Sequence, residues 1–237
     1  MSMENHISTQ HQSDVALQNN VTVYLTRVYN WMALALFATG LIAYYTASSE
    51  YLMSLIFSSQ IVFFGIIIAE LLLVVYLSRS IHKMSQNTAI MAFLIYAVLN
   101  GLTMSVIFMM YTTSSIASTF FVTAGTFGAM SLYGYYTKRD LTKLGNLAFM
   151  GLIGIILASV VNIFLQNDMM GWIITYLGVA IFVGLTAYDT QKLKEIGAKG
   201  FNSGESMEKL AIMGALTLYL DFINLFLFLL RIFGDRK

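Results

Sequence analysis

Long apolar segments alternate with short polar stretches along most of the chain. Seven such segments are each close to the roughly 20 residues that a helix needs to cross the hydrocarbon core of a bilayer. The connections between most of them are short, as in a tightly packed bundle. The pattern therefore predicts an all-α membrane protein with seven transmembrane helices, at residues 28–47, 55–77, 88–110, 115–137, 145–165, 171–191 and 210–232.

Two stretches interrupt this pattern with polar residues. The first 20 residues are polar and lack the apolar core of a cleavable signal peptide, so we expect residues 1–20 to form a flexible cytoplasmic tail. Residues 21–237 then form one seven-helix transmembrane domain. The second polar stretch, 192–209, contains three glycines and is predicted to be a solvent-exposed loop.

The distribution of Lys and Arg predicts the orientation in the membrane. Basic residues precede the first segment, at Arg27, and follow the second, fourth and sixth, whereas the loops after the first, third and fifth have none. Because basic loops stay in the cytoplasm, the N-terminus is predicted to be cytoplasmic. Arg231, Arg236 and Lys237 break the alternation, so the last segment either crosses the membrane or re-enters it; its length from Leu210 favours crossing.

Composition narrows the function classes further. The chain of 237 residues is 58% hydrophobic and only 11% charged, whereas a soluble domain has about a quarter charged residues. The absence of cysteine excludes disulfides and thiolate sites, and the absence of proline excludes proline kinks. A net charge of +1 does not indicate nucleic acid as a partner.

Three carboxylates lie inside apolar segments: Glu70, Asp189 and Asp221. An acid at membrane depth is costly unless it is paired, hydrated or protonated, and such acids usually have a function. Excess negative charge inside the bundle favours cations or protons over anionic cargo. If the membrane portion of the last helix starts near Ala215, Asp221 lies at the depth of Asp189 and the two carboxyls meet.

Two carboxylates that meet share a proton, because both cannot ionise cheaply. The pair would then sense pH, since the half-protonated form links two helices and full deprotonation separates them or recruits a cation. Arg79, at a similar depth, is a candidate partner for the ionised form. The alternative is that each aspartate only fixes helix register through a neighbour, Thr186 or Asn224. Glu70 belongs to a polar network or pore, or is a protonated packing residue.

Four stretches resemble the bacterial inner-membrane branch of the Bax inhibitor-1 family, also called the transmembrane Bax inhibitor motif family. The resemblance runs from about Thr22 to the end, and the motif around Asp221 is highly specific. It is carried by "SIASTFFVTAGTFGAMSLYGYYTKRDL" (115–141), "GLIGIILASVVNIFLQ" (151–166), "GLTAYDTQKLK" (184–194) and "ALTLYLDFINLFLFLLRIFG" (215–234).

The resemblance implies a central last helix wrapped by six others and a pH-sensitive calcium leak. An aspartate pair gates that leak in the family, and Asp189 and Asp221 match it. An Arg in the second helix closes a latch in one branch, for which Arg79 is the nearest candidate. Some bacterial relatives bind a membrane-bound AAA protease.

Three functions are compatible with these residues. The first is a cation leak in which Asp189 and Asp221 form a weak, transient cation site: calcium takes six to eight oxygen ligands, and weak binding suits passage. No cofactor is expected; calcium or protons would be the permeant ions. An intramembrane aspartyl protease is disfavoured because "LYL" precedes Asp221 where that chemistry has Gly-x-Gly, so we do not expect an enzyme. The third is a modulator or scaffold for a membrane protease. In each case we expect a multi-pass protein of the bacterial inner membrane.

Overall fold

The computed structural model describes the backbone of residues 2–81, 83–199 and 206–237, and side chains from residue 18 onward within these ranges. In the described residues every named element is a helix, and seven helical spans are long and apolar enough to cross a membrane. The prediction of an all-α bundle with seven transmembrane helices is confirmed. The helices are α1 (Ser2–Ala47), α2 (Glu50–Phe57), α3 (Gln60–Ser80), α4 (Gln86–Met104), α5 (Val106–Met110), α6 (Thr113–Tyr136), α7 (Thr142–Leu165), α8 (Asp168–Lys199) and α9 (Met207–Phe233).

Serine and threonine side chains cap several helices where polar stretches interrupt the apolar pattern. Ser49 accepts a hydrogen bond from the backbone N–H of Leu52 at α2, and Ser85 accepts one from Thr88 at α4. Such caps satisfy backbone donors that the first turn leaves free. The predicted segment 55–77 begins too early, because α2 ends at Phe57 and the second membrane span starts at Gln60.

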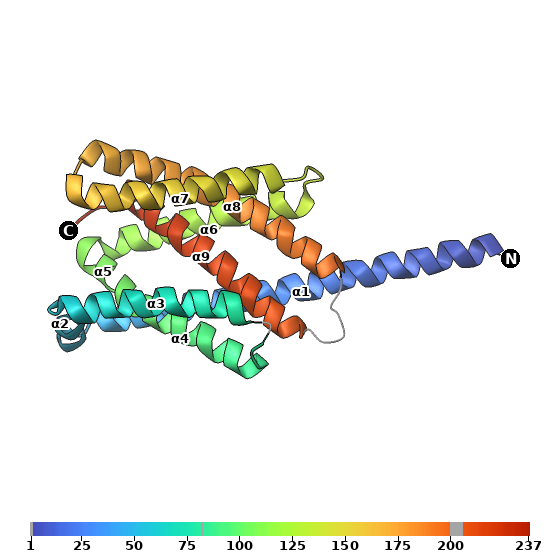
Figure 1. Cartoon of the computed structure of the whole chain (residues 1–237), viewed down its shortest axis with the longest axis horizontal. Helices are drawn as coiled ribbons and strands as arrows, with labels where there is room; N and C mark the ends of the chain where they lie inside the picture. Colours follow the sequence, from blue (N-terminus) through green and yellow to red (C-terminus); the bar gives the residue numbers. More distant parts are fainter. Residues whose placement is uncertain (1, 82, 200–205) are drawn as a thin grey trace.

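Helix α9 lies at the centre of the bundle. In its most apolar stretch 61% of the residues are buried, against 6% in α3. It packs against α1, α4, α6 and α8, and Figure 1 shows it running between the other helices. Glu208, in its first turn, accepts hydrogen bonds from Arg27 and Trp31 of α1. The predicted central position of the last helix is therefore confirmed.

Helix α8 continues through Lys199, so the prediction of a loop over 192–209 is wrong for its first half. Lys and Glu favour helix, and Gly197 is accommodated because it lies against α1. A Cβ added to Gly197 would lie 3.1 Å from Cα of Val21. The glycine serves close helix packing here, whereas the sequence pattern assigned it to a turn.

The last helix crosses the whole bundle as one continuous element. Its far end contacts the connection between α5 and α6: the N–H of Thr112 donates to the carbonyl of Asp235 at 3.0 Å, and the N–H of Lys237 donates to Met110 at 3.0 Å. The two chain ends lie at opposite ends of the molecule (Figure 1). This geometry favours a crossing helix over a re-entrant one.

The predicted tail is helical in the structure. Helix α1 begins at Ser2, and its first turns project beyond the bundle (Figure 1). The boundary at residue 20 and the flexibility of the tail stay predictions.

Close approach between α6 and α8 depends on a single glycine. A Cβ at Gly134 would overlap the backbone carbonyl of Ala187, two residues before Asp189. By contrast, nothing lies within 4 Å of a Cβ at Gly125 or Gly128 of the same helix. Gly134 therefore sets the separation of α6 from the part of α8 that carries Asp189.

We expect Gly134→Ala to destabilise the fold by about 1–3 kcal/mol, because the new methyl group forces two backbones apart. Thermal unfolding of the purified protein in detergent measures this loss. The matched control is Gly125→Ala, which adds the same methyl group to open space on the same helix. Equal melting temperatures for the two variants would contradict the assigned contact.

Candidate functional site

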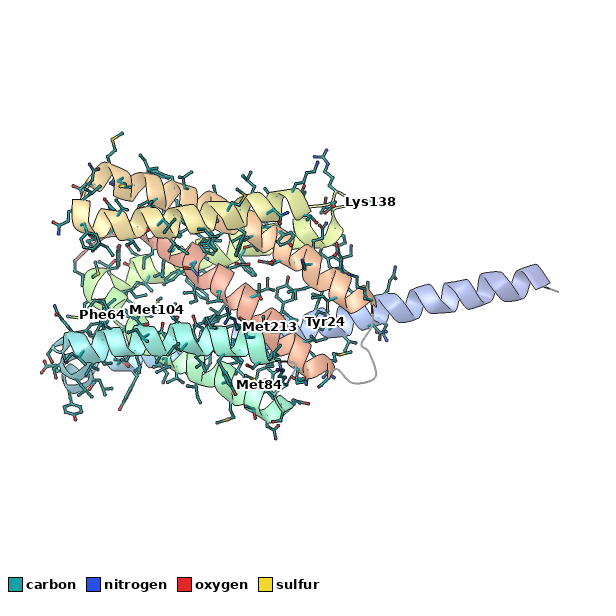
Figure 2. The ribbon with its side chains drawn as sticks, in the orientation of Figure 1. Tyr24, Phe64, Met84, Met104, Lys138 and Met213 are labelled. Atoms are coloured by element: carbon teal, nitrogen blue, oxygen red, sulfur yellow. The ribbon has the colours of Figure 1, made fainter. Side chains whose placement is uncertain are left out.

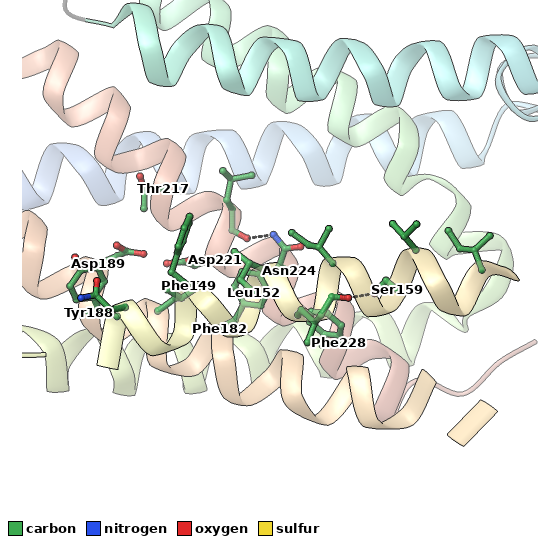
Figure 3. Close-up of a pocket in the computed structure, with 18 residues that line it drawn as sticks. Phe149, Leu152, Ser159, Phe182, Tyr188, Asp189, Thr217, Asp221, Asn224 and Phe228 are labelled. Carbon is green, nitrogen blue, oxygen red and sulfur yellow. Dashed lines mark hydrogen bonds between the residues drawn. The ribbon is translucent and has the colours of Figure 1, made fainter. Parts of the chain in front are cut away.

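The structure brings Asp189 of α8 and Asp221 of α9 together, as predicted. Their carboxyl groups are within hydrogen-bonding reach of each other, so one donates to the other when it is protonated. Asp221 is only 4% exposed, and Asp189 is partly buried. Figure 3 shows both side chains beside one cavity. The two helices that carry them, α8 and α9, pack against each other.

One oxygen of the pair has no partner among the described residues. The Oδ2 atom of Asp221 is buried and accepts no hydrogen bond from that part of the chain. A buried polar atom without a partner costs about 1–3 kcal/mol, and more when it is charged. Two full negative charges at this spot are therefore unfavourable, and the pair calls for a shared proton or a cation.

Lys192, about one turn further along α8, is a basic side chain that acts on Asp189. Its ammonium interacts electrostatically with Asp189, donates to the hydroxyl of Tyr188 at 3.0 Å, and lies 5.4 Å from the centre of that ring. The Tyr188 ring in turn packs over Gly145 of α7, where a Cβ would overlap it. Lys192, bonded to Tyr188, thus places a positive charge that acts on Asp189.

A cavity of about 760 Å³ extends from the aspartate pair between α7, α8 and α9 (Figure 3). Most of its wall is apolar. The polar groups that face it besides the aspartates include Thr217 and Asn224 of α9 and Ser159 of α7. The cavity therefore joins two acids at one end to a long apolar slot.

A second cavity, of about 280 Å³, is lined by Asp189 and by residues of α1, α8 and α9. Tyr24 and Met213, labelled in Figure 2, line it together with Lys192. The two cavities share Tyr188, Asp189 and Thr217 as lining residues. Asp189 thus lines both cavities, whereas Asp221 lines the larger one.

Three other predicted residues lie outside the pair. Arg79 is exposed at the end of α3, which packs against α2 and α4, and within the described ranges it forms no ion pair or hydrogen bond with either aspartate. Thr186 is buried and donates to the carbonyl of Phe182 at 2.7 Å. Asn224 donates to the carbonyl of Leu220 at 2.8 Å and lines the larger cavity.

Glu70 belongs to a separate polar network. It accepts hydrogen bonds from Thr103 at 3.0 Å and from Asn100 at 3.4 Å. Asn100 accepts one from the hydroxyl of Tyr219, which is also 2.7 Å from the hydroxyl of Thr39. The network joins α1, α3, α4 and α9, so Glu70 contacts other helices rather than the aspartate pair.

Sequence reasoning did not identify Thr217, Tyr188 and Lys192 as part of the site. Helical spacing was the available signal: Thr217 precedes Asp221 by four residues, and Lys192 follows Asp189 by three, so each shares a helix face with its aspartate. Tyr188 carried no such signal, because neighbouring residues on a helix do not share a face.

Comparison with known proteins identifies the family. The pattern of the family described as "Inhibitor of apoptosis-promoting Bax1" matches residues 21–237, which include every residue of the site. The chain belongs to the Bax inhibitor-1 family.

Several bacterial members of the Bax inhibitor-1 family resemble the chain over most of its length. "Inner membrane protein YbhL" of Escherichia coli K12 is 55% identical over 215 residues, which is 90% of this chain and 92% of that protein. A Rickettsia prowazekii protein, RP147, is 46% identical over 90% of both chains, and a Borreliella burgdorferi protein is 42% identical over 97% of both. The seven apolar spans and these relatives support a multi-pass inner-membrane protein.

Proposed function

We propose that the chain is a pH-sensitive cation leak of the inner membrane, gated by Asp189 and Asp221. One observation carries this proposal: two carboxyls from different helices interact with each other beside a cavity, and one of them, Asp189, also lines a second cavity. A change at this pair alters both the link between α8 and α9 and the passage between the cavities.

Protonation closes the gate in this mechanism. With one shared proton, a hydrogen bond between the carboxyls ties α8 to α9. Loss of that proton leaves two like charges in a buried site, which separate or bind a cation. Lys192, rather than Arg79, is positioned to hold the ionised form of Asp189, because its ammonium already acts on that carboxyl.

Calcium is the proposed permeant ion on the basis of the family. The described residues contain no group of three or more His, Cys, Asp or Glu that could hold a metal ion. Two carboxylates supply only part of the six to eight oxygens that calcium takes, so water would complete the shell. A site that binds weakly releases what it admits, as conduction requires.

The test is calcium influx into liposomes that contain the purified protein, followed with an enclosed calcium dye at a series of pH values. We expect influx above that of protein-free liposomes, rising with pH because protons and calcium compete for the same oxygens. An enclosed pH dye in parallel liposomes distinguishes calcium from protons as the permeant ion. Influx no faster than in protein-free liposomes at every pH would refute the leak.

The alternative, a modulator of a membrane-bound AAA protease, is favoured by one structural feature. Helix α1 projects beyond the bundle and offers a helical segment outside the membrane domain (Figure 1). Co-purification of such a protease that depends on residues 2–17, together with no calcium influx, would favour this function over the leak.

A further inference from the structure

The larger cavity is built for more than a small hydrated ion. Aromatic rings from three helices line it, at Phe149, Phe182 and Phe228, together with aliphatic side chains such as Leu152 and Ile155. Its volume of about 760 Å³ is within the range of small-molecule sites, which are mostly apolar with a few convergent polar groups. A hydrated ion gains nothing from such a wall, whereas an apolar ligand does.

The charge in this cavity lies at one end. Asp189 and Asp221 line it, and the buried Oδ2 atom of Asp221 has no hydrogen-bond partner in the described part of the chain. A cationic donor at this spot would satisfy the oxygen and offset the charge of the pair. A neutral acyl chain would leave the oxygen unpartnered, and a lipid phosphate would be repelled by it.

The cavity is accessible from the side of the bundle. Several of its α7 residues are exposed, including Phe149 at 59%, Ile156 at 53% and Ile163 at 69%. These side chains lie on a membrane-spanning helix, so a ligand dissolved in the bilayer reaches the cavity without crossing water. Figure 3 shows Phe149 and Leu152 of α7 and Asp221 of α9 among the side chains that line the cavity.

We propose that this cavity binds a lipophilic organic ammonium from the bilayer. The ammonium nitrogen donates to the Asp189–Asp221 carboxyls, and the apolar body lies along Leu152, Phe182 and Phe228. The proposal uses the same carboxyls as the proposed gate, but it does not require that any ion passes through the protein.

Binding is tested with radiolabelled phenylbutylamine and its neutral analogue phenylbutanol, by equilibrium dialysis against the full chain in lipid nanodiscs at mildly alkaline pH. We expect saturable amine binding that Asp221→Asn weakens by about tenfold or more, because the variant keeps the shape and removes a charge. Phenylbutanol binding should change little in that variant, which shows that the cavity is still folded. The control Asp168→Asn removes a carboxylate outside the cavity and should leave both affinities unchanged.

A second pair of variants tests the apolar end. Leu152→Trp fills the cavity and should reduce the binding of both compounds, whereas Leu157→Trp adds the same ring to a side chain of α7 that is 61% exposed and outside the cavity. Equal amine binding by Asp221→Asn and the parent, or by the two tryptophan variants, would overturn the proposal. Amine binding without calcium influx would refute only the leak; influx without amine binding would refute only this site.

Discussion

Replacing Asp221 with asparagine should leave calcium influx into proteoliposomes independent of pH. Asparagine has nearly the shape of aspartate but does not ionise, so no proton is shared with Asp189. In the parent, influx should change by up to about tenfold for each pH unit in the titration range, because release of one shared proton opens the gate. The measurement is the initial rate of calcium influx at matched protein density across that range.

Companion variants make this result specific. Asp189→Asn should also remove the pH dependence, since the proton belongs to the pair rather than to either residue. Calcium influx through Asp168→Asn, which lies at the other end of α8, should depend on pH as it does in the parent. If Asp221→Asn still follows the pH profile of the parent, Asp221 is not the sensor and the proposed gate is wrong.

Replacing Thr217 with tryptophan should reduce calcium influx by about tenfold or more. Thr217 lines both cavities and lies one turn before Asp221, so an added indole fills the junction that an ion must pass. Protein interiors are close-packed, and a passage that loses its free volume at one point is blocked there. The same influx assay, at the pH of fastest influx in the parent, measures the effect.

The matched control is Thr217→Val, which keeps the side-chain volume and removes only the hydroxyl. Influx through this variant should stay close to that of the parent if bulk is what blocks the path. Monodisperse elution of both variants in detergent verifies that each is folded. Unchanged influx in Thr217→Trp would place the ion path outside these two cavities.

The two predictions address different parts of one mechanism. Asp221→Asn removes the sensor and leaves the free volume of the passage unchanged, whereas Thr217→Trp blocks the passage and leaves the sensor intact. Residual influx in Thr217→Trp should therefore keep its pH dependence. A variant that altered both properties together would indicate that the junction and the carboxyl pair move as one unit.

Helix lengths were harder to predict than helix number. The apolar pattern located all seven spans, because a run of about twenty apolar residues is typical of a transmembrane helix and rare in other structures. It failed where charged residues continue a helix: α8 runs through Lys199 although four of residues 192–199 are charged. A polar segment indicates exposure to water. It does not distinguish a loop from a helix that continues beyond the membrane, because both are exposed.

The sequence pattern also did not identify which glycines make close contacts between helices. The sequence contains Gly125 and Gly128 in small-residue spacings that often mark helix contacts, yet neither has a neighbour within 4 Å of an added Cβ. Gly134 makes the close contact with α8. Spacing describes which face a residue shares, but which helix lies on that face depends on how the whole bundle packs.

The sequence by itself determined the class of protein, the seven spans and the two aspartates, because a charge in an apolar run is rare and costly wherever the helix packs. Tertiary structure alone decided which groups meet that pair. It placed α7 along the cavity that the pair lines, left Arg79 exposed on α3, and put Glu70 in a separate network with Asn100 and Thr103. The physical reason is that the free-energy cost of burying a charge depends on that one side chain and can be read from the sequence. Contacts between helices depend on where the helices cross, which no local sequence pattern encodes.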